Sequence, residues 1–364
     1  MKKTKILISI LILAFSAACG LAPVNVPVIP LASGSGGGPL IIMAPANATP
    51  TPTPFMPSPP TPTYIPTLYP TPTFVPTSTP GVTEFVTKTW NDYPGPVVWP
   101  DVEIPSPVGI LAEPRDQVNI LLLGSDQRPN EGGLRTDTII LLTLNPAEGT
   151  VNLTSFPRDL YVYIPGWTVQ RINTAYGYGG FDLLAVTMEY NFGVRPDYYV
   201  LVNFWSFTDA IDSLNGIDVN AAISLTDHRD DHGQYTVPAG ITHMDGETAL
   251  WYVRSRYSTS DFDRGRRQQE VVQATFNKLL SLDGISRAPQ LYEIYRKNVT
   301  TDMSFDQIAP FLPLAAKLTD TSKIHHYFIG LQQVIPYVNS VGAQVLLPIR
   351  DAVLEVMNQA LNVP

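Results

Sequence analysis

The pattern of apolar and polar positions divides the chain near residue 115. After this point, continuous apolar runs typical of buried strands occur at 118–123, 138–144, 151–156 and 198–202. Helical spacing of apolar residues predicts helices at 181–192, 204–214, 246–252, 264–282, 305–318 and 341–361. Strands interleaved with helices predict one α/β or α+β domain at 115–364, in which helices flank a central mixed β-sheet.

Residues 20–114 have the composition of a linker. They contain 23 of the 35 prolines, including a Thr-Pro alternation from Thr49 to Pro80. Such a sequence cannot bury a core, and it favours the extended polyproline II conformation. We therefore expect a disordered spacer that holds the folded domain away from residues 1–19.

Residues 1–19 have the pattern of an export signal. A basic start with Lys2, Lys3 and Lys5 precedes a short apolar core at 6–15, and small residues then lead to Cys19, the single cysteine of the sequence. An apolar run this short is typical of a signal peptide rather than a membrane-spanning helix. The small residues before Cys19 predict a lipoprotein cleavage site, with simple secretion and an uncleaved anchor as alternatives. All three place the remainder of the protein outside the cytoplasmic membrane, attached to it or secreted to the cell envelope.

The charged residues add a chemical hypothesis. Between Thr89 and Asn277 there are twelve arginines and no lysine, although the net charge of the whole chain is -9. The acidic balance argues against nucleic-acid binding, which normally requires a basic excess. Arginine is favoured where a planar fork of donors must grip a phosphate or a carboxylate at two points.

Many of these arginines stand beside aspartates where strands or helices are predicted to end. Examples are Asp126 with Arg128, Arg135 with Asp137, and Arg158 with Asp159. Each pair taken singly is explained equally well by an ordinary surface ion pair. Together they predict a phosphoryl-transfer site, which needs carboxylates for a metal and arginines around the phosphate oxygens. Asp126 and Asp137 are hard oxygen ligands that suit Mg²⁺ or Mn²⁺, and the five histidines do not support a zinc site.

The ordered set of motifs resembles the LytR-CpsA-Psr family of cell-wall glycopolymer transferases. The motifs that carry the resemblance are Asp126-Gln-Arg128, Arg135-Thr-Asp137-Thr, Phe156-Pro-Arg158-Asp159, Arg171-Ile-Asn173, Arg254-Ser-Arg256, and Asp261-Phe-Asp263-Arg264 with Arg267-Gln268-Gln269. The resemblance runs from Asn119 to Gln273, and more faintly to Gly330. It implies an extracytoplasmic enzyme that moves a glycan phosphate from a polyprenyl-pyrophosphate carrier to peptidoglycan.

The resemblance also implies roles for individual residues. Asp126 and Asp137 would lie near Mg²⁺, and the catalytic residues would be Asp261, Arg158 and Arg254. Asp261 would either accept the proton of the acceptor hydroxyl or orient an arginine. The pyrophosphate would be bound by Arg128, Arg135, Arg158, Arg171, Arg254, Arg256, Arg264, Arg267 and Gln268. An apolar pocket between sheet and helices would hold the polyprenyl chain, with Ile120, Leu122, Ile140, Leu142, Leu184, Val200 and Phe207 as candidate lining residues.

The sequence departs from the family pattern at a few positions and leaves two alternative functions open. Arg171 stands where the family often has lysine, Thr174 replaces a common alanine, and Asp263 replaces a frequent glycine. The proline-rich linker and Cys19 stand in place of the usual transmembrane anchor. The alternatives are a pyrophosphatase that uses water as the acceptor for the same lipid, and a non-catalytic wall-anchored protein that binds polyprenyl phosphates or glycans.

Overall fold

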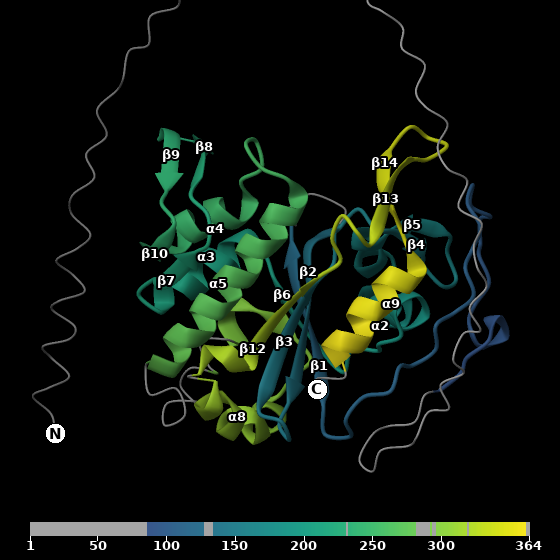
Figure 1. Ribbon diagram of the computed structural model, residues 1–364, viewed down its shortest axis with the longest axis horizontal. Helices are drawn as coiled ribbons and strands as arrows, with labels where there is room; N and C mark the ends of the chain where they lie inside the picture. The colour runs from purple at the N-terminus through teal and green to yellow at the C-terminus, as the bar shows by residue number, and fades with distance from the viewer. Residues whose placement is uncertain are drawn as a thin grey trace, which may run out of the picture. The chain divides into compact units, whose positions relative to one another are not determined.

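The computed structural model describes residues 86–126, 134–230, 232–281, 292, 296–318 and 320–361. The expected signal peptide with Cys19, most of the expected linker, and Arg128 therefore lie outside the described residues. The described residues form three layers, with helices covering both faces of a central sheet (Figure 1). No described helix combines the length and the apolar character that crossing a bilayer requires.

The central sheet is mixed, as the sequence predicts. Its strand order among the described residues is β11-β6-β1-β2-β3-β12. The β1–β2 and β2–β3 pairs are antiparallel, while β6 runs parallel to β1 and β12 runs parallel to β3. The consecutive strands β2 and β3 form a hairpin. The strands are β1 (Val118–Ser125), β2 (Thr136–Asn145), β3 (Thr150–Ser155), β6 (Tyr198–Val202), β11 (Thr300–Thr301) and β12 (Ile324–Phe328).

Alternate residues of the central strands pack against different helices. Leu121 and Ile139 share a core with α2 (Ala175–Phe192) and α9 (Arg350–Leu361). Leu122 and Ile140 belong to the opposite face, which is covered by α5 (Asp261–Ser281) with α3 (Phe204–Ser213) and α4 (Gly246–Arg254). Because both faces are covered, the strands need apolar residues at successive positions. This explains the continuous apolar runs in the sequence.

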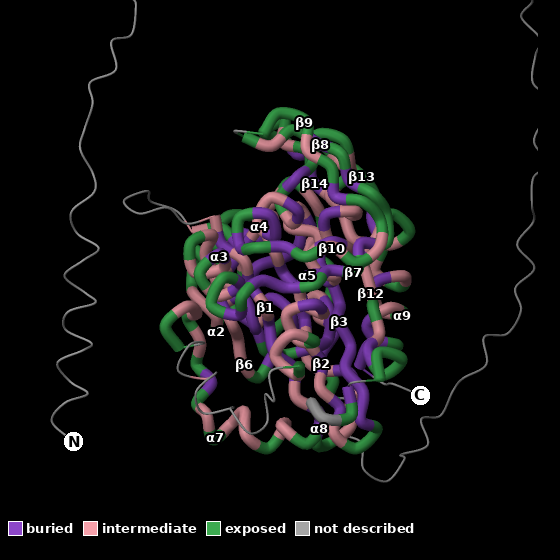
Figure 2. The backbone as a smooth tube through the Cα atoms, turned by 90° about the vertical axis from the view of Figure 1, so that its left-hand side faces the viewer, coloured by how far each residue is buried: buried purple, intermediate pink, exposed green. Residues whose placement is uncertain are grey.

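Four two-stranded sheets surround the central sheet. They pair β4 (Tyr161–Tyr163) with β5 (Val169–Arg171), β7 (Ile217–Ala221) with β10 (Gly240–Met244), β8 (Leu225–Arg229) with β9 (Gly233–Val237), and β13 (Val334–Val338) with β14 (Gln344–Pro348), all within the described residues. Figure 2 shows the β8–β9 and β13–β14 hairpins at the same end of the domain, with much of their surface exposed. Short helical turns complete the fold, namely η1 (Trp90–Asp92), η2 (Ile172–Thr174) and η4 (Thr321–Lys323).

Two predicted helices are wrong in their extent. The helix expected at 341–361 begins only at Arg350, because residues 344–348 pair with β13 as strand β14. The helix expected at 305–318 is divided into α7 (Phe305–Ile308), η3 (Ala309–Phe311) and α8 (Leu312–Lys317). Pro310 and Pro313 fall in that stretch, and proline cannot donate the backbone hydrogen bond that a continuous helix needs. The helix expected at 181–192 ends as predicted, at Gly193, whose φ of 74° suits glycine.

The folded domain begins earlier than residue 115. Residues 86–114, which composition assigns to the linker, pack along the domain, and Val108 and Leu111 are buried in the core beside α2. Glu189 of α2 is fully buried and is contacted there by Lys88, by the hydroxyl of Tyr93 at 2.8 Å and by Arg195 at 3.1 Å. This proline-rich stretch is therefore part of the folded domain, because apolar residues between its prolines are buried beside α2.

Glu189 provides a test of how this segment is attached. Burial raises the pKa of its carboxyl, but the hydrogen bonds from Lys88, Tyr93 and Arg195 outweigh burial and hold the pKa below its ordinary value. We expect Glu189→Gln to lower the free energy of unfolding by about 1–3 kcal/mol at neutral pH, measured by urea denaturation. The difference should vanish as the pH falls through the lowered pKa of the folded state, because both proteins are then uncharged at this position. Glu103→Gln, at an exposed carboxylate of the same segment, is the control, and an equal loss at every pH would contradict the assignment.

Candidate functional site

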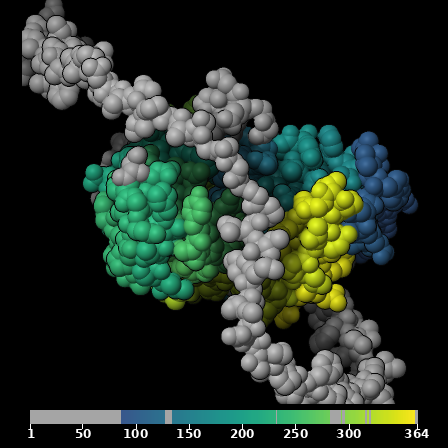
Figure 3. Space-filling model, turned by 90° about the horizontal axis from the view of Figure 1, so that it is seen from above, coloured from purple at the N-terminus to yellow at the C-terminus, as the bar shows by residue number. Residues whose placement is uncertain are grey.

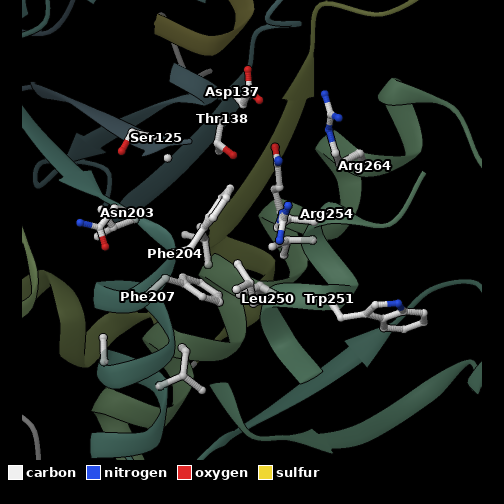
Figure 4. A pocket seen from close by; sticks show the side chains of 18 of the residues that line it. Ser125, Asp137, Thr138, Asn203, Phe204, Phe207, Leu250, Trp251, Arg254 and Arg264 are labelled. Atoms are coloured by element: carbon white, nitrogen blue, oxygen red, sulfur yellow. The ribbon is translucent and has the colours of Figure 1, made fainter. Parts of the chain in front are cut away.

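A cavity of about 1230 Å³ lies between the central sheet and helices α3, α4 and α5. Much of its wall is apolar, and Phe204, Phe207 and Leu250 point into it in Figure 4. Four of the predicted pocket residues line it, namely Leu122, Ile140, Val200 and Phe207. Ile120, Leu142 and Leu184 are not among the lining residues, and Leu184 packs in the core on the opposite face of the sheet. The predicted apolar pocket between sheet and helices is therefore present.

Charged residues gather at one end of the same cavity. They come from the ends of β1, β2 and β3, from the end of α4 and from the first turn of α5. Residues far apart in the sequence thus share one opening, as the sequence predicts for a phosphate site. The predicted site residues that line the cavity are Asp126, Arg135, Asp137, Arg158, Arg254, Arg256, Arg264 and Gln268.

A β-bulge brings Asp137 to this opening. Gly124 pairs with Thr138 and Ser125 pairs with Thr136, so Asp137 is an extra residue between two pairs. Consecutive residues of a regular strand face opposite sides of the sheet. Asp137 and Thr138 nevertheless both line the cavity, and Figure 4 shows them close together. The bulge therefore turns a carboxylate toward the site that regular pairing would direct away from it.

Arg158 is shared by three carboxylates. Its Nη1 lies 2.8 Å from Asp137 Oδ2, and its Nε lies 3.4 Å from Asp159 Oδ2 and 3.9 Å from Asp261 Oδ2. Burial lowers the pKa of Arg158, but the charges of the three aspartates outweigh burial and raise the pKa above its ordinary value. The charge of Arg158 is thus compensated by the protein itself.

Arg264 and Asp261 form a second pair on the first turn of α5. Arg264 Nη1 lies 3.2 Å from Asp261 Oδ1, and the guanidinium of Arg264 is almost fully buried. Burial lowers the pKa of Arg264, and the charge of Asp261 only partly offsets this effect. Asp261 itself lines a smaller adjoining cavity, whose walls also include Asp137, Arg158, Arg264 and Gln268.

Arg254 and Arg256 differ from these two arginines. Within the described residues neither of them forms an ion pair, and both side chains are exposed. The guanidinium carbon of Arg254 lies 4.1 Å from the ring centre of Phe204, which is a cation–π contact. The contact uses the face of the guanidinium group and leaves the N–H donors at the edge of that group available. Arg135 is intermediate, since it lies 3.2 Å from Asp126 but remains largely exposed. This opening therefore offers free positive charge to an anion.

Two buried groups hold the loop that carries Arg254 and Arg256. Asp227 of β8 accepts hydrogen bonds from the Ser255 hydroxyl and from the backbone N–H groups of Tyr257 and Ser258. Burial raises the pKa of Asp227, but these hydrogen bonds outweigh burial and lower the pKa below its ordinary value. From the other side, Arg267 of α5 donates to the carbonyl oxygens of Tyr252 and Ser255.

Two predicted pyrophosphate ligands do not reach the cavity. Arg267 is fully buried. Its donors bond to backbone carbonyl oxygens and to the hydroxyl of Thr259 at 2.9 Å, and not to a ligand in the cavity. Arg171 lies 3.1 Å from Asp159 and donates a 2.8 Å hydrogen bond to the carbonyl oxygen of Gln344 in β14. Both residues are ordered parts of the structure around the site, and neither lines the cavity.

The structure adds residues that the sequence analysis missed. Asp227 could have been found, because strand alternation places it on the same buried face as Leu225. Arg229 belongs to none of the predicted site motifs, yet it lines the cavity and donates to the Thr248 hydroxyl at 3.2 Å. Nothing in the local sequence indicates the stacking of Phe204 on Arg254, because the two residues belong to different helices.

Comparisons with known proteins agree on one family. The LytR_cpsA_psr family profile matches residues 100–359. The polyisoprenyl-teichoic acid–peptidoglycan teichoic acid transferase TagU of Oceanobacillus iheyensis is 38% identical over 210 residues, which are 56% of this chain and 64% of that protein. TagU of Bacillus subtilis is 34% identical over 197 residues, 53% of this chain and 62% of that protein. The chain thus spans less than two thirds of the length of these two relatives.

Solved structures show the same relationship. The structure of Bacillus subtilis TagV superimposes with a TM-score of 0.58 and 26% identity, covering 68% of this chain and 98% of TagV. A structure of TagT bound to LIIa-WTA superimposes with a TM-score of 0.54 and 29% identity, covering 68% of this chain and 92% of TagT.

The clamp on the Arg254–Arg256 loop can be tested with an anion probe. We expect Asp227→Asn to weaken the binding of inorganic pyrophosphate about tenfold, because the loop loses the charged acceptor of its hydrogen bonds. Calorimetric titration measures this affinity. Asp218→Asn, at an exposed carboxylate of the neighbouring strand β7, should leave the affinity unchanged. A lower melting temperature with unchanged pyrophosphate affinity would show that Asp227 supports the fold and not the site.

Proposed function

The chain belongs to the LytR-CpsA-Psr family, and we propose that it is an extracytoplasmic phosphotransferase acting on a polyprenyl-pyrophosphate-linked glycan. One observation carries this proposal, namely a single cavity with a large apolar wall and an arginine-lined opening. A lipid pyrophosphate has the same two parts, an apolar chain and a compact double anion. The glycan phosphate would be transferred to a hydroxyl group of peptidoglycan. The names of the relatives, polyisoprenyl-teichoic acid–peptidoglycan transferases, support the choice of donor and acceptor.

In this proposal the polyprenyl chain lies among Leu122, Ile140, Val200 and Phe207, and the pyrophosphate lies at the charged opening. Arg254 and Arg256 bind its oxygens directly, because they are exposed and have no ion-pair partner among the described residues. Arg135, Arg264 and Gln268 line the same opening and add further donors. The sugar hydroxyl attacks the glycan-linked phosphorus, and the bond from this phosphorus to the bridging oxygen breaks. Polyprenyl phosphate leaves, and its newly freed oxygen accepts the proton of the attacking hydroxyl. The fixed guanidinium groups stabilise the charge that develops on the phosphoryl oxygens.

Asp261 is assigned to orienting arginines. One of its carboxylate oxygens pairs with Arg264 and the other faces Arg158. This geometry favours orienting arginines over accepting the proton of the acceptor hydroxyl, because both carboxylate oxygens are directed at guanidinium groups. Arg158 in turn pairs with Asp137, so Asp261 and its two arginines form one rigid unit with Asp137 beside the transferred phosphate. Positioning of the reacting groups then supplies much of the catalysis.

Mg²⁺, or Mn²⁺ in its place, fits the acidic residues of the opening. Asp126 and Asp137 line the cavity from the ends of adjacent strands, and Arg135 and Arg158 compensate their charge. Within the described residues no three His, Cys, Asp or Glu side chains form a closed metal cluster. Mg²⁺ commonly uses one or two carboxylates together with phosphate oxygens and water. A bound ion would neutralise part of the pyrophosphate charge.

We also propose that the protein is held at the membrane from which it takes its donor. The basic and apolar pattern of residues 1–19 and the small residues before Cys19 support a lipoprotein anchor. The Thr-Pro alternation that follows would act as a semi-rigid spacer between anchor and domain.

The products of the reaction separate this function from the pyrophosphatase alternative. With a lipid-pyrophosphate glycan and Mg²⁺, we expect glycan phosphate attached to peptidoglycan fragments, together with polyprenyl phosphate, measured by mass spectrometry. Without the acceptor, turnover should fall strongly. Release of free sugar phosphate alone, with and without acceptor, would establish hydrolysis in place of transfer.

Substitutions at the opening separate catalysis from simple binding. We expect Arg254→Ala to reduce kcat/KM about 100-fold or more, because a free donor to the transferred phosphate is lost. Asp261→Asn should reduce kcat with little change in KM, because Arg158 and Arg264 lose their orientation. Arg115→Ala, at an exposed arginine that does not line the cavity, is the control. Retained glycan attachment by the Arg254 variant, in cells that lack a redundant homologue, would contradict a catalytic role.

A further inference from the structure

The β13–β14 hairpin has an unusual surface composition. From Leu331 to Ile349 the sequence contains no charged residue. The hairpin nevertheless extends from the end of the domain, where Ile335, Val338 and Val341 are exposed, the last of them to 83%. Single apolar residues are common on protein surfaces, but an uncharged exposed hairpin with several of them is not.

A second exposed apolar segment lies in residues 97–99. Val97 and Val98 are exposed, and Trp99 is 76% exposed. The backbone N–H groups of Val97 and Val98 donate to the carbonyl oxygen of Trp167, at 2.8 and 3.3 Å. The ring of Trp167 stacks on Tyr178 with 4.6 Å between ring centres, and both rings are partly exposed.

One carboxylate joins the two apolar segments. Asp101 accepts a 2.6 Å hydrogen bond from the backbone N–H of Ser340, at the tip of the hairpin, and a 3.2 Å bond from the Tyr161 hydroxyl. In Figure 3 the blue segment and the yellow C-terminal region adjoin on the same side of the domain, as they do in Figure 1. Together the exposed residues form a surface that we call the apolar rim, consisting of Val97, Val98, Trp99, Trp167, Tyr178, Ile335, Val338 and Val341.

We propose that the apolar rim docks the domain on the surface of a lipid bilayer. Exposed tryptophan and tyrosine beside uncharged aliphatic side chains are typical of residues that enter the membrane–water interface. The net charge of -9 and the lack of charged residues in the hairpin make apolar insertion, rather than attraction to anionic lipids, the driving interaction. The basic and apolar pattern of residues 1–15 independently indicates a chain that is delivered to a membrane. These observations favour lipid over a second copy of the chain or a glycan.

Strand β14 of the hairpin is tied to the residues beside the charged opening of the cavity. The backbone N–H of Leu346 donates a 3.0 Å hydrogen bond to the carbonyl oxygen of Asp159, the neighbour of Arg158. Arg171 bridges the same two elements, since it contacts the Asp159 carboxylate and the Gln344 carbonyl oxygen. Docking of the rim therefore places the opening near the lipid headgroups. This consequence rests on the proposed function, because it matters only for a donor that resides in the bilayer.

Tryptophan fluorescence tests the contact directly. The full chain is reconstituted in vesicles of phosphatidylethanolamine and phosphatidylglycerol that include brominated phosphatidylcholine, which quenches tryptophan within the bilayer. We expect marked quenching that is unchanged in high salt, because apolar contacts are not screened. The double variant Trp99→Phe/Trp167→Phe should lose the quenched emission. Trp205→Phe, which removes a 51% exposed tryptophan of α3 outside the rim, should keep it.

A charge at the hairpin tip tests the proposal without removing a fluorophore. We expect Val338→Asp/Val341→Asp to reduce the quenching about tenfold, because a carboxylate in the interface opposes insertion. Ile241→Asp is the matched control, since Ile241 is 80% exposed on β10 and lies outside the rim. The tip variant should also turn over a vesicle-embedded donor at least several-fold more slowly, while its rate on a detergent-dispersed donor stays at the wild-type value.

Three results would overturn the proposal. The first is an absence of quenching in the wild type, and the second is equal quenching in the tip variant and the wild type. The third is burial of Trp99 by peptidoglycan fragments or by dimerisation, seen by fluorescence and sedimentation, with no quenching by brominated lipid. Failure of turnover in both donor formats, with quenching intact, would refute the proposed function and leave the membrane contact standing.

Discussion

Compensation of the charge of Arg158 is the interaction on which the site depends. Three aspartates from β2, from the segment after β3 and from α5 meet at one guanidinium group, whose positive charge offsets the mutual repulsion of the carboxylates. Each of the three elements is thereby fixed relative to the others. Because Arg158 is occupied in this way, the task of binding an external anion falls to other arginines. The site thus consists of a rigid ionic unit beside a free positive surface.

The arginines of this segment consequently divide into groups with different physical roles. Arg264 is buried and Arg158 is half-buried, and both are paired with aspartates, while Arg254 and Arg256 are exposed and unpaired within the described residues. Arg267 is buried without a carboxylate partner among the described residues, and its Nη1 and Nη2 atoms donate to backbone carbonyl oxygens. Burying such a group is costly unless its donors are used. The hydrogen bonds of Arg267 fix the loop that presents the two free arginines. Asp227 holds the same loop through the Ser255 hydroxyl.

The apolar features of the domain follow from the same arrangement. One face of the sheet packs fully against α2 and α9, whereas α3, α4 and α5 on the other face enclose a cavity. That cavity ends at the charged opening, and the β13–β14 hairpin is attached beside it through Asp159 and Arg171. The apolar cavity, the arginine-lined opening and the apolar rim are thus joined through neighbouring elements. A donor that resides in the bilayer, as proposed, would use all three features.

The sequence by itself determined the features that depend on local patterns. Continuous apolar runs predicted a sheet covered on both faces, and paired Arg and Asp motifs predicted that charged residues meet at strand ends. It could not separate Arg267, which bonds to backbone carbonyls, from Arg264, which lines the cavity three residues earlier on the same helix, because the surroundings of each side chain depend on distant segments. Only the tertiary structure showed that residues 86–114 belong to the domain and that 344–348 form a strand, since both rest on contacts with remote segments. The periodicity of apolar residues indicates which side chains are buried. Which segment buries each side chain depends on tertiary packing between residues that are distant in the sequence.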